Sequence, residues 1–139
     1  MNLDPDALSV GDDLPTFHVD DLDRTQIVRY LGASGDFNPL HHDDEFSRAA
    51  GQDGVIVPGM LVAGFASAAV TDWVPIDAVD RFRTRFVGTV RPGDSLRVSG
   101  TVAEVETDRT GNTTTVEISI TVDTADGATV LEGDATISP

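Results

Sequence analysis

The chain has 139 residues, a formal net charge of −15 and no cysteine. Its length suits one domain with its own core, and a hydrophobic content of 40% argues against wholesale disorder. The lack of cysteine excludes disulfides and thiolate metal ligands, and the negative charge disfavours a nucleic-acid partner, because a polyanion would be repelled.

The first half of the chain predicts mainly short helices. We expect a strand over residues 14–19, a helix within residues 21–35 that Gly32 and Gly35 end, and a short helix over residues 44–51. Asp21 or Asp23 can cap the first helix, and the carboxylates of Asp43, Asp44 and Glu45 suit the start of the next helix while facing water.

The second half predicts one buried helix followed by strands. The helix, over residues 59–73, is apolar nearly all round and rich in Gly and Ala, which indicates burial on most sides. Turn sequences separate four strands, expected over residues 79–90, 94–106, 113–124 and 128–138. An early strand, a buried helix and a four-stranded antiparallel meander predict one α+β domain over residues 1–139, of the hotdog kind, with a sheet curled around the helix.

The sequence indicates no membrane association. The acidic N-terminal stretch lacks the pattern of a signal peptide, and the most apolar stretch, residues 55–70, is shorter than a membrane span and interrupted by Pro58 and Gly59. All nine basic residues are arginines, and this lysine-free, aspartate-rich composition resembles that of proteins from salt-loving archaea, where salt screens self-repulsion. We expect a cytoplasmic protein that needs molar salt; a merely well-solvated surface is the alternative.

The stretch "SGDFNPLHHDD", residues 34–44, holds two of the three histidines. Asp36 and His41 flank Asn38 and Pro39, and the proline keeps the residue before it out of the helical region. A turn of this kind can point both side chains into one cavity, where they could share proton transfer around one water. On spacing alone, a simple hydrogen bond within the turn stays open.

Two motifs resemble those of the MaoC-like dehydratases, a family that includes (R)-specific enoyl-CoA hydratases and 3-hydroxyacyl dehydratases. They are "ASGDFNPLHHDDEF", residues 33–46, and "VIVPGMLVAGFASAAV", residues 55–70. The resemblance covers essentially the whole chain. One departure is Pro58, which stands where the family usually has histidine.

The resemblance implies hydration of a trans-2-enoyl thioester, or the reverse dehydration. It makes Asp36 and His41, rather than His42, the groups that hold and deprotonate water, and the Gly59 N–H the donor to the thioester oxygen. It implies no metal and no cofactor beyond the coenzyme A or phosphopantetheine thioester of the substrate. A metal site at His41, His42 and Asp43 is the disfavoured alternative.

Further residues are candidates for substrate binding. The motif positions expected to line the substrate are Asn38, Pro58, Met60 and Ser67, although Ser67 also suits simple packing. Arg81, Arg83 and Arg85 alternate on one strand face and could meet phosphates, or could pair with local carboxylates. The opposite face, expected to pack on the helix, carries Phe82, Thr84 and Phe86.

Two other functions stay open: a hotdog thioesterase, and a non-catalytic acyl-binding subunit of a dehydratase complex. The presence of both Asp36 and His41 argues against the second. A lone hotdog leaves a sheet edge open, so we expect a homodimer or a multiple of it, with a heteromeric partner as the alternative.

Overall fold

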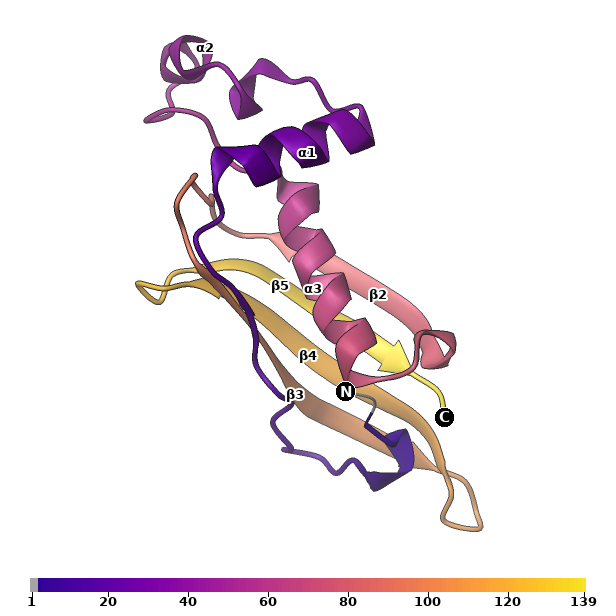
Figure 1. Cartoon of the computed structure of the whole chain (residues 1–139). Coiled ribbons are helices and arrows are strands. Elements are labelled where there is room, and N and C mark those ends of the chain that lie inside the picture. Colours follow the sequence, from indigo (N-terminus) through magenta and orange to yellow (C-terminus); the bar gives the residue numbers. More distant parts are fainter. Residues whose placement is uncertain (1–2) are drawn as a thin grey trace.

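One long helix lies against a five-stranded antiparallel sheet in the computed structural model, which describes residues 3–139 (Figure 1). Met1 and Asn2, part of the expected domain, lie outside the described residues. The helices are η1 (Pro5–Ala7), α1 (Arg24–Ser34), η2 (Pro39–His41), α2 (Asp44–Ala49), α3 (Gly59–Trp73) and η3 (Ile76–Ala78). The strands are β1 (Phe17–Val19), β2 (Val79–Phe86), β3 (Leu96–Thr107), β4 (Thr113–Thr124) and β5 (Thr129–Ile137). The predicted α+β hotdog is confirmed.

The strand order corrects the predicted four-stranded meander. Strands β3, β4 and β5 are consecutive neighbours, but β2 pairs with β5, giving the order β1-β3-β4-β5-β2. The physical reason is that β1 already occupies the outer edge of β3, with Phe17 opposite Val98, so β2 joins the other edge of the sheet. The meander is therefore three strands long.

Two of the expected strands are shorter in the structure. The strand expected over residues 14–19 pairs regularly only over β1, since Pro15 has no N–H to donate. The strand expected over residues 79–90 ends at Phe86, where the N–H groups of Val87 and Gly88 both donate to the Val130 carbonyl and the regular ladder stops.

Helix α3 is the centre of the core, as its small apolar residues predict. Ala66, Ala69 and Trp73 are fully buried against the sheet. A Cβ at Gly100 on β3 would lie 2.6 Å from the Trp73 ring, so only glycine lets the strand pass this closely. The indole N–H of Trp73 donates to the Pro15 carbonyl at 2.6 Å and ties the end of the helix to the chain entering β1.

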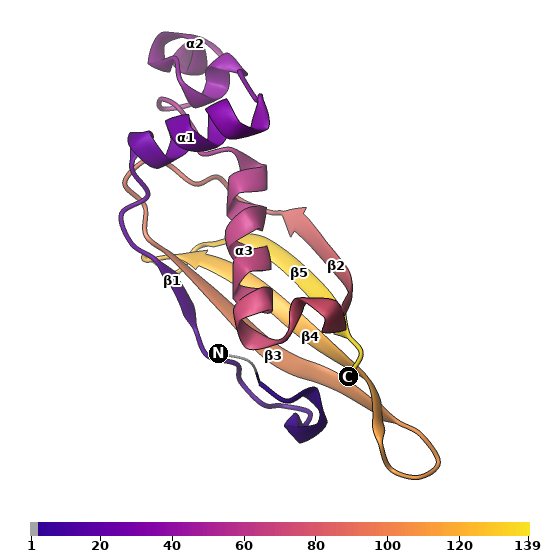
Figure 2. The same cartoon turned by 45° about the vertical axis from the view of Figure 1, so that its right-hand side comes forward.

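The chain between β1 and α3 folds over one end of the molecule. Helix α1 crosses the N-terminal end of α3, and α2 lies beyond it, in both views (Figures 1 and 2). Asp23 caps α1 by accepting from Gln26 N–H at 2.8 Å, and Gly35 ends it with φ 72°, while Gly32 lies inside the helix. Among residues 3–139, no helix is long and apolar enough to cross a membrane.

Candidate active site

The turn after α1 is fixed by its own side chains. Asn38 is extended, with ψ 124°, as expected before proline, and its side-chain oxygen accepts from Leu40 N–H at 3.0 Å. One carboxylate oxygen of Asp36 accepts from Asn38 N–H at 3.2 Å. These local bonds hold the backbone between Asp36 and His41 in one conformation.

The turn brings Asp36 and His41 together. His41 Nε2 lies 3.6 Å from Asp36 Oδ2, and the side chains are 12% and 40% exposed respectively. This separation is longer than a direct hydrogen bond, so a water or substrate oxygen can bridge the two groups. The pair is thus held close while keeping hydrogen-bonding capacity for a third group.

A backbone carbonyl orients the His41 ring. Nδ1 of His41 lies 2.8 Å from the Ile56 carbonyl oxygen. Because a carbonyl can only accept, Nδ1 carries the hydrogen, and Nε2 of the neutral ring presents a lone pair toward Asp36. The ring can therefore accept a proton at Nε2.

His42 is arranged differently. It is exposed, and its Nε2 lies 3.2 Å from the Phe37 carbonyl oxygen. The ring nitrogen that lies 3.6 Å from Asp36 belongs to His41, so the two neighbouring histidines have different surroundings.

Gly59 begins α3 at the same end of the molecule. The first N–H groups of a helix lack intrahelical partners and carry partial positive charge, so they suit a developing oxyanion. A Cβ at Gly59 would lie 3.1 Å from the Phe86 ring, so the glycine keeps this helix start open. Gly59, Phe86 and Ile56 line a cavity of about 120 Å³, which links the helix start to the segment that orients His41.

The other motif residues on α3 lie at different depths. Pro58 is buried and caps the helix without a side-chain bond, its carbonyl accepting from Leu61 N–H at 3.0 Å. Met60 is 63% exposed in the first turn. Ser67 is partly buried and lies about 12 Å along the axis from Gly59, given 1.5 Å per residue.

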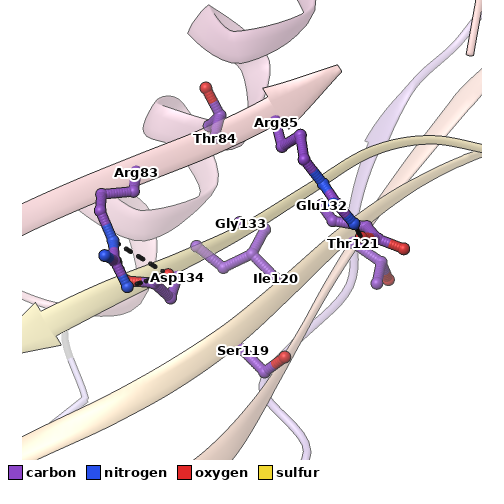
Figure 3. A pocket seen from close by; sticks show the side chains of 9 residues that line it. All are labelled: Arg83, Thr84, Arg85, Ser119, Ile120, Thr121, Glu132, Gly133 and Asp134. Carbon is purple, nitrogen blue, oxygen red and sulfur yellow. Dashed lines mark hydrogen bonds and ion pairs between the residues drawn. The ribbon is translucent and has the colours of Figure 1, made fainter. Parts of the chain in front are cut away.

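Two of the three arginines of β2, Arg83 and Arg85, line a larger cavity of about 540 Å³ (Figure 3). Arg83 makes three hydrogen bonds to Asp134 at 2.9–3.2 Å, and Arg85 donates to Glu132 at 2.6 Å. Arg81 lies 3.6 Å from Glu117. Local pairing, one of the two alternatives left by the sequence, is what these contacts show. The lining comes from β2, β4 and β5 and includes neither the Asp36 turn nor α3.

The opposite face of β2 turns toward the helix. Phe82 packs against the hydrophobic core, and the Phe86 ring lies beside Gly59. Thr84 points away from the carboxylates that Arg83 and Arg85 contact (Figure 3). The expected two-sided character of this strand is therefore present.

Asp44 corrects an expectation from the sequence. Instead of simply facing water, it is half-buried, with Oδ1 accepting from Val55 N–H and from Arg24 Nη2, both at 3.0 Å. The bond from Val55 and the Arg24 guanidinium lower the pKa of Asp44, against an opposing effect of burial. The side chain faces inward because the loop after α2 returns to it, which helical periodicity alone does not reveal.

Ser47 is a second residue without a sequence signal. It is fully buried on α2, and its hydroxyl donates to the Leu40 carbonyl at 3.0 Å. The same carbonyl accepts from Ile56 N–H at 3.0 Å, so it joins the turn, α2 and the segment before α3. In the part of the chain that the structure describes, no group of three His, Cys, Asp or Glu side chains is placed to hold a metal ion.

A family model described as "MaoC like domain" matches residues 9–125. The chain belongs to the MaoC-like domain family. This range includes the Asp36–His41 turn and all of α3.

Several relatives are similar in sequence to part of this MaoC-like chain. It is 42% identical over 66 residues to "Enoyl-CoA hydratase 2, peroxisomal" of Arabidopsis thaliana and 38% identical over 68 residues to "Enoyl-CoA hydratase ChsH3" of Mycobacterium tuberculosis. These matches cover 45% and 47% of this chain but only 21% and 24% of the relatives. The unliganded R-hydratase PhaJ1 of Pseudomonas aeruginosa superimposes with a TM-score of 0.83 at 25% identity, covering 99% of this chain and 86% of that one.

Proposed function

We propose that this MaoC-like protein catalyses the (R)-specific hydration of a trans-2-enoyl thioester, or the reverse dehydration of a 3-hydroxyacyl thioester. The observation that carries the proposal is the Asp36–His41 pair, 3.6 Å apart, with the Nδ1 hydrogen of His41 fixed by the Ile56 carbonyl. The similarity to an R-hydratase along nearly the whole chain supports the reaction class and its stereochemistry.

In the hydration direction, a water lies between Asp36 and His41. Nε2 of His41 takes one proton, the water oxygen bonds to C3, and the electrons of the C2–C3 double bond move to the thioester oxygen. The carboxylate of Asp36 accepts a hydrogen bond from the water and orients it. A proton from the Asp36–His41 pair then adds to C2, so one water has been added across the double bond.

The negative charge that develops on the thioester oxygen needs a donor. The N–H of Gly59 supplies it at the start of α3, where the helix dipole is favourable and a substrate can approach a residue without a side chain. Pro58 has no N–H, so the donor is Gly59 or a residue after it. The chemistry uses no cofactor beyond the coenzyme A or phosphopantetheine thioester that carries the acyl group.

A second copy of the chain is the expected partner. Strand β2 is an edge strand of the sheet. Phe86 and Val87, near its end, are 48% and 42% exposed, and Met60, which follows Gly59, is 63% exposed. Pairing two copies would cover these side chains and place the acyl sites near the interface. Light scattering at high salt should give a dimer or a multiple of it; a fully active monomer would contradict this.

The decisive experiment offers purified protein trans-2-enoyl-CoAs of graded length in molar KCl. Hydration lowers the absorbance of the conjugated enoyl thioester and gives (R)-3-hydroxyacyl-CoA, which chiral analysis identifies. Release of free coenzyme A thiol without loss of the double bond would instead identify a thioesterase. Tight acyl-CoA binding with neither reaction would indicate a non-catalytic subunit.

A further inference from the structure

The segment before α3 is held by three successive backbone N–H groups. Val55 N–H donates to Asp44 at 3.0 Å, Ile56 N–H to the Leu40 carbonyl at 3.0 Å, and Val57 N–H to the Val90 carbonyl at 2.8 Å. Two of these three acceptors are backbone carbonyls, and the third is the carboxylate of Asp44.

The carbonyl that orients His41 lies within this segment. A trans peptide is planar, so the Ile56 carbonyl points opposite to the Val57 N–H. The direction of that carbonyl, 2.8 Å from His41 Nδ1, therefore depends on how firmly the segment is held. Any rotation of these peptides would move the acceptor away from the ring.

The first of the three peptides follows a glycine, the residue that restrains the backbone least. Gly54 precedes Val55 with φ 147°, a conformation that side chains disfavour, and a Cβ there would lie 3.0 Å from Asp44 Oδ1. Glycine thus permits the close approach of Asp44 but does not restrain the backbone. The restraint comes from the Asp44 carboxylate itself.

Arg24 fixes the carboxylate in turn. Arg24 Nη2 lies 3.0 Å from Oδ1 and 2.9 Å from Oδ2 of Asp44, and Arg24 is the first residue of α1. One carboxylate therefore joins the start of α1, the start of α2 and the segment that precedes α3. The Asp36–His41 turn lies in the chain between α1 and α2.

We propose that Asp44, held by Arg24, is a positioning residue that keeps His41 in its Nδ1–H tautomer. Without it only the bonds from Ile56 N–H to the Leu40 carbonyl and from Val57 N–H to the Val90 carbonyl would hold the segment. The Ile56 carbonyl would then be less firmly directed, and the ring could move its hydrogen to Nε2. That tautomer presents N–H rather than a lone pair toward Asp36, so it cannot accept a proton from water. The effect on catalysis rests on the proposed hydration, whereas the effect on the tautomer does not.

The test combines ring NMR with kinetics. Nitrogen-15 labelling of histidine gives signals from only three residues, which the variants His18→Gln, His41→Ala and His42→Ala assign. Asp44→Ala should shift neutral His41 toward the Nε2–H tautomer and lower the hydration kcat roughly tenfold, with little change in KM. Asp44→Asn retains an oxygen that can accept from Val55 N–H, so it should lie between Asp44→Ala and the original protein, as should Arg24→Gln.

Two neighbouring variants serve as matched controls. Glu45→Gln removes the same charge from the same turn of α2, and Asp43→Ala removes the N-cap bond to Phe46 N–H and lowers stability without touching the 55–57 segment. Both should leave the His41 tautomer and kcat close to those of the original protein. A tautomer that stays Nδ1–H in Asp44→Ala and Asp44→Asn, or a kcat loss matched by Asp43→Ala, would overturn the proposal. An original protein that hydrates no enoyl thioester but shows the tautomer shift would retain the positioning role and remove the proposed function.

Discussion

Two pairs in this molecule each join a basic side chain to an aspartate, but they differ in geometry. In the turn after α1, His41 and Asp36 lie 3.6 Å apart, and the His41 side chain is 12% exposed. On β2, Arg83 makes three hydrogen bonds of 2.9–3.2 Å to Asp134, and the Arg83 side chain is 62% exposed. The first pair is open to a third group, while the second is closed.

Cavity size and available hydrogen-bonding capacity do not go together in these two regions. The larger cavity, about 540 Å³, is bordered by side chains whose polar groups already bind one another. The smaller one, about 120 Å³, adjoins Gly59, whose N–H at the start of α3 has no intrahelical partner. A substrate gains more from the second kind of surface, since it does not have to displace an existing partner.

The largest expected effect comes from breaking the open pair. Asp36→Asn keeps the shape but removes the charged acceptor, and His41→Ala removes the ring, so each should lower the hydration rate roughly 10²-fold or more. The double variant should lose less than the product of the single losses, because both groups act on one water. Single-turnover hydration by folded variants at matched salt measures this.

His42→Ala is the control for the open pair. His42 is exposed and bound to the Phe37 carbonyl, so its loss should change the rate little. Equal losses from His41→Ala and His42→Ala, or full activity of Asp36→Asn, would contradict the assignment.

The next effect concerns the opening at the start of α3. Gly59→Ala places a Cβ 3.1 Å from the Phe86 ring, so the ring or the helix start must shift. We expect kcat to fall roughly tenfold, because small misplacements of a donor weaken its bond to the transition state. Adding Phe86→Leu should relieve the contact and restore part of the rate. A Gly59→Ala variant with unchanged kcat and melting temperature would show that this helix start tolerates a side chain.

The open pair was largely predictable because its determinants are local. Asn38 and Pro39 set the turn, and Gly35 ends α1 with a positive φ, so few residues decide where Asp36 and His41 point. The helix expected over residues 59–73 matches α3, because an all-round apolar pattern of this length has few other solutions.

The remaining features depend on distant parts of the chain. The position of β2 follows from which sheet edges other strands leave available, and the pairing of Arg83 with Asp134 follows from the β2–β5 register. The Ile56 carbonyl carries no side-chain signal at all, and Asp44 meets Val55 only after the intervening loop returns to α2. Sequence motifs therefore indicated the Asp36–His41 pair but not the groups that orient it.

Salt should change the thermal stability of the whole chain. With a net charge of −15, self-repulsion should destabilise the fold in dilute buffer, and screening by molar KCl should raise the melting temperature by roughly 5 °C or more. Calorimetry across a KCl series measures it. An unchanged melting temperature would show that paired surface charges such as Arg83–Asp134 already balance the repulsion.

Breaking the closed pair should have a small effect. Arg83→Gln removes an exposed ion pair, so the free energy of unfolding should change little, and less still in high salt. Neither kcat nor KM should move, with Arg85→Gln as the matched variant. A tenfold rise in KM for enoyl-CoA would instead favour the alternative that these arginines meet substrate phosphates.

The smallest expected effect concerns Asp108, in the turn between β3 and β4, whose carboxylate also already has hydrogen-bond partners. The Thr110 hydroxyl, with the N–H groups of Asn112 and Thr110, lowers the pKa of Asp108 from 3.8 to about 2. A carboxylate whose pKa is lower in the folded state than in the unfolded state stabilises the fold at pH values above its unfolded-state pKa. This stabilisation is lost as the pH falls through the folded-state pKa. The original protein should therefore lose more stability than Asp108→Asn between pH 3.8 and about 2, while both hydrate equally well at neutral pH. Urea unfolding at several pH values in constant high salt gives the difference. Parallel pH profiles for the two proteins would show that the turn bonds do not distinguish folded from unfolded chains.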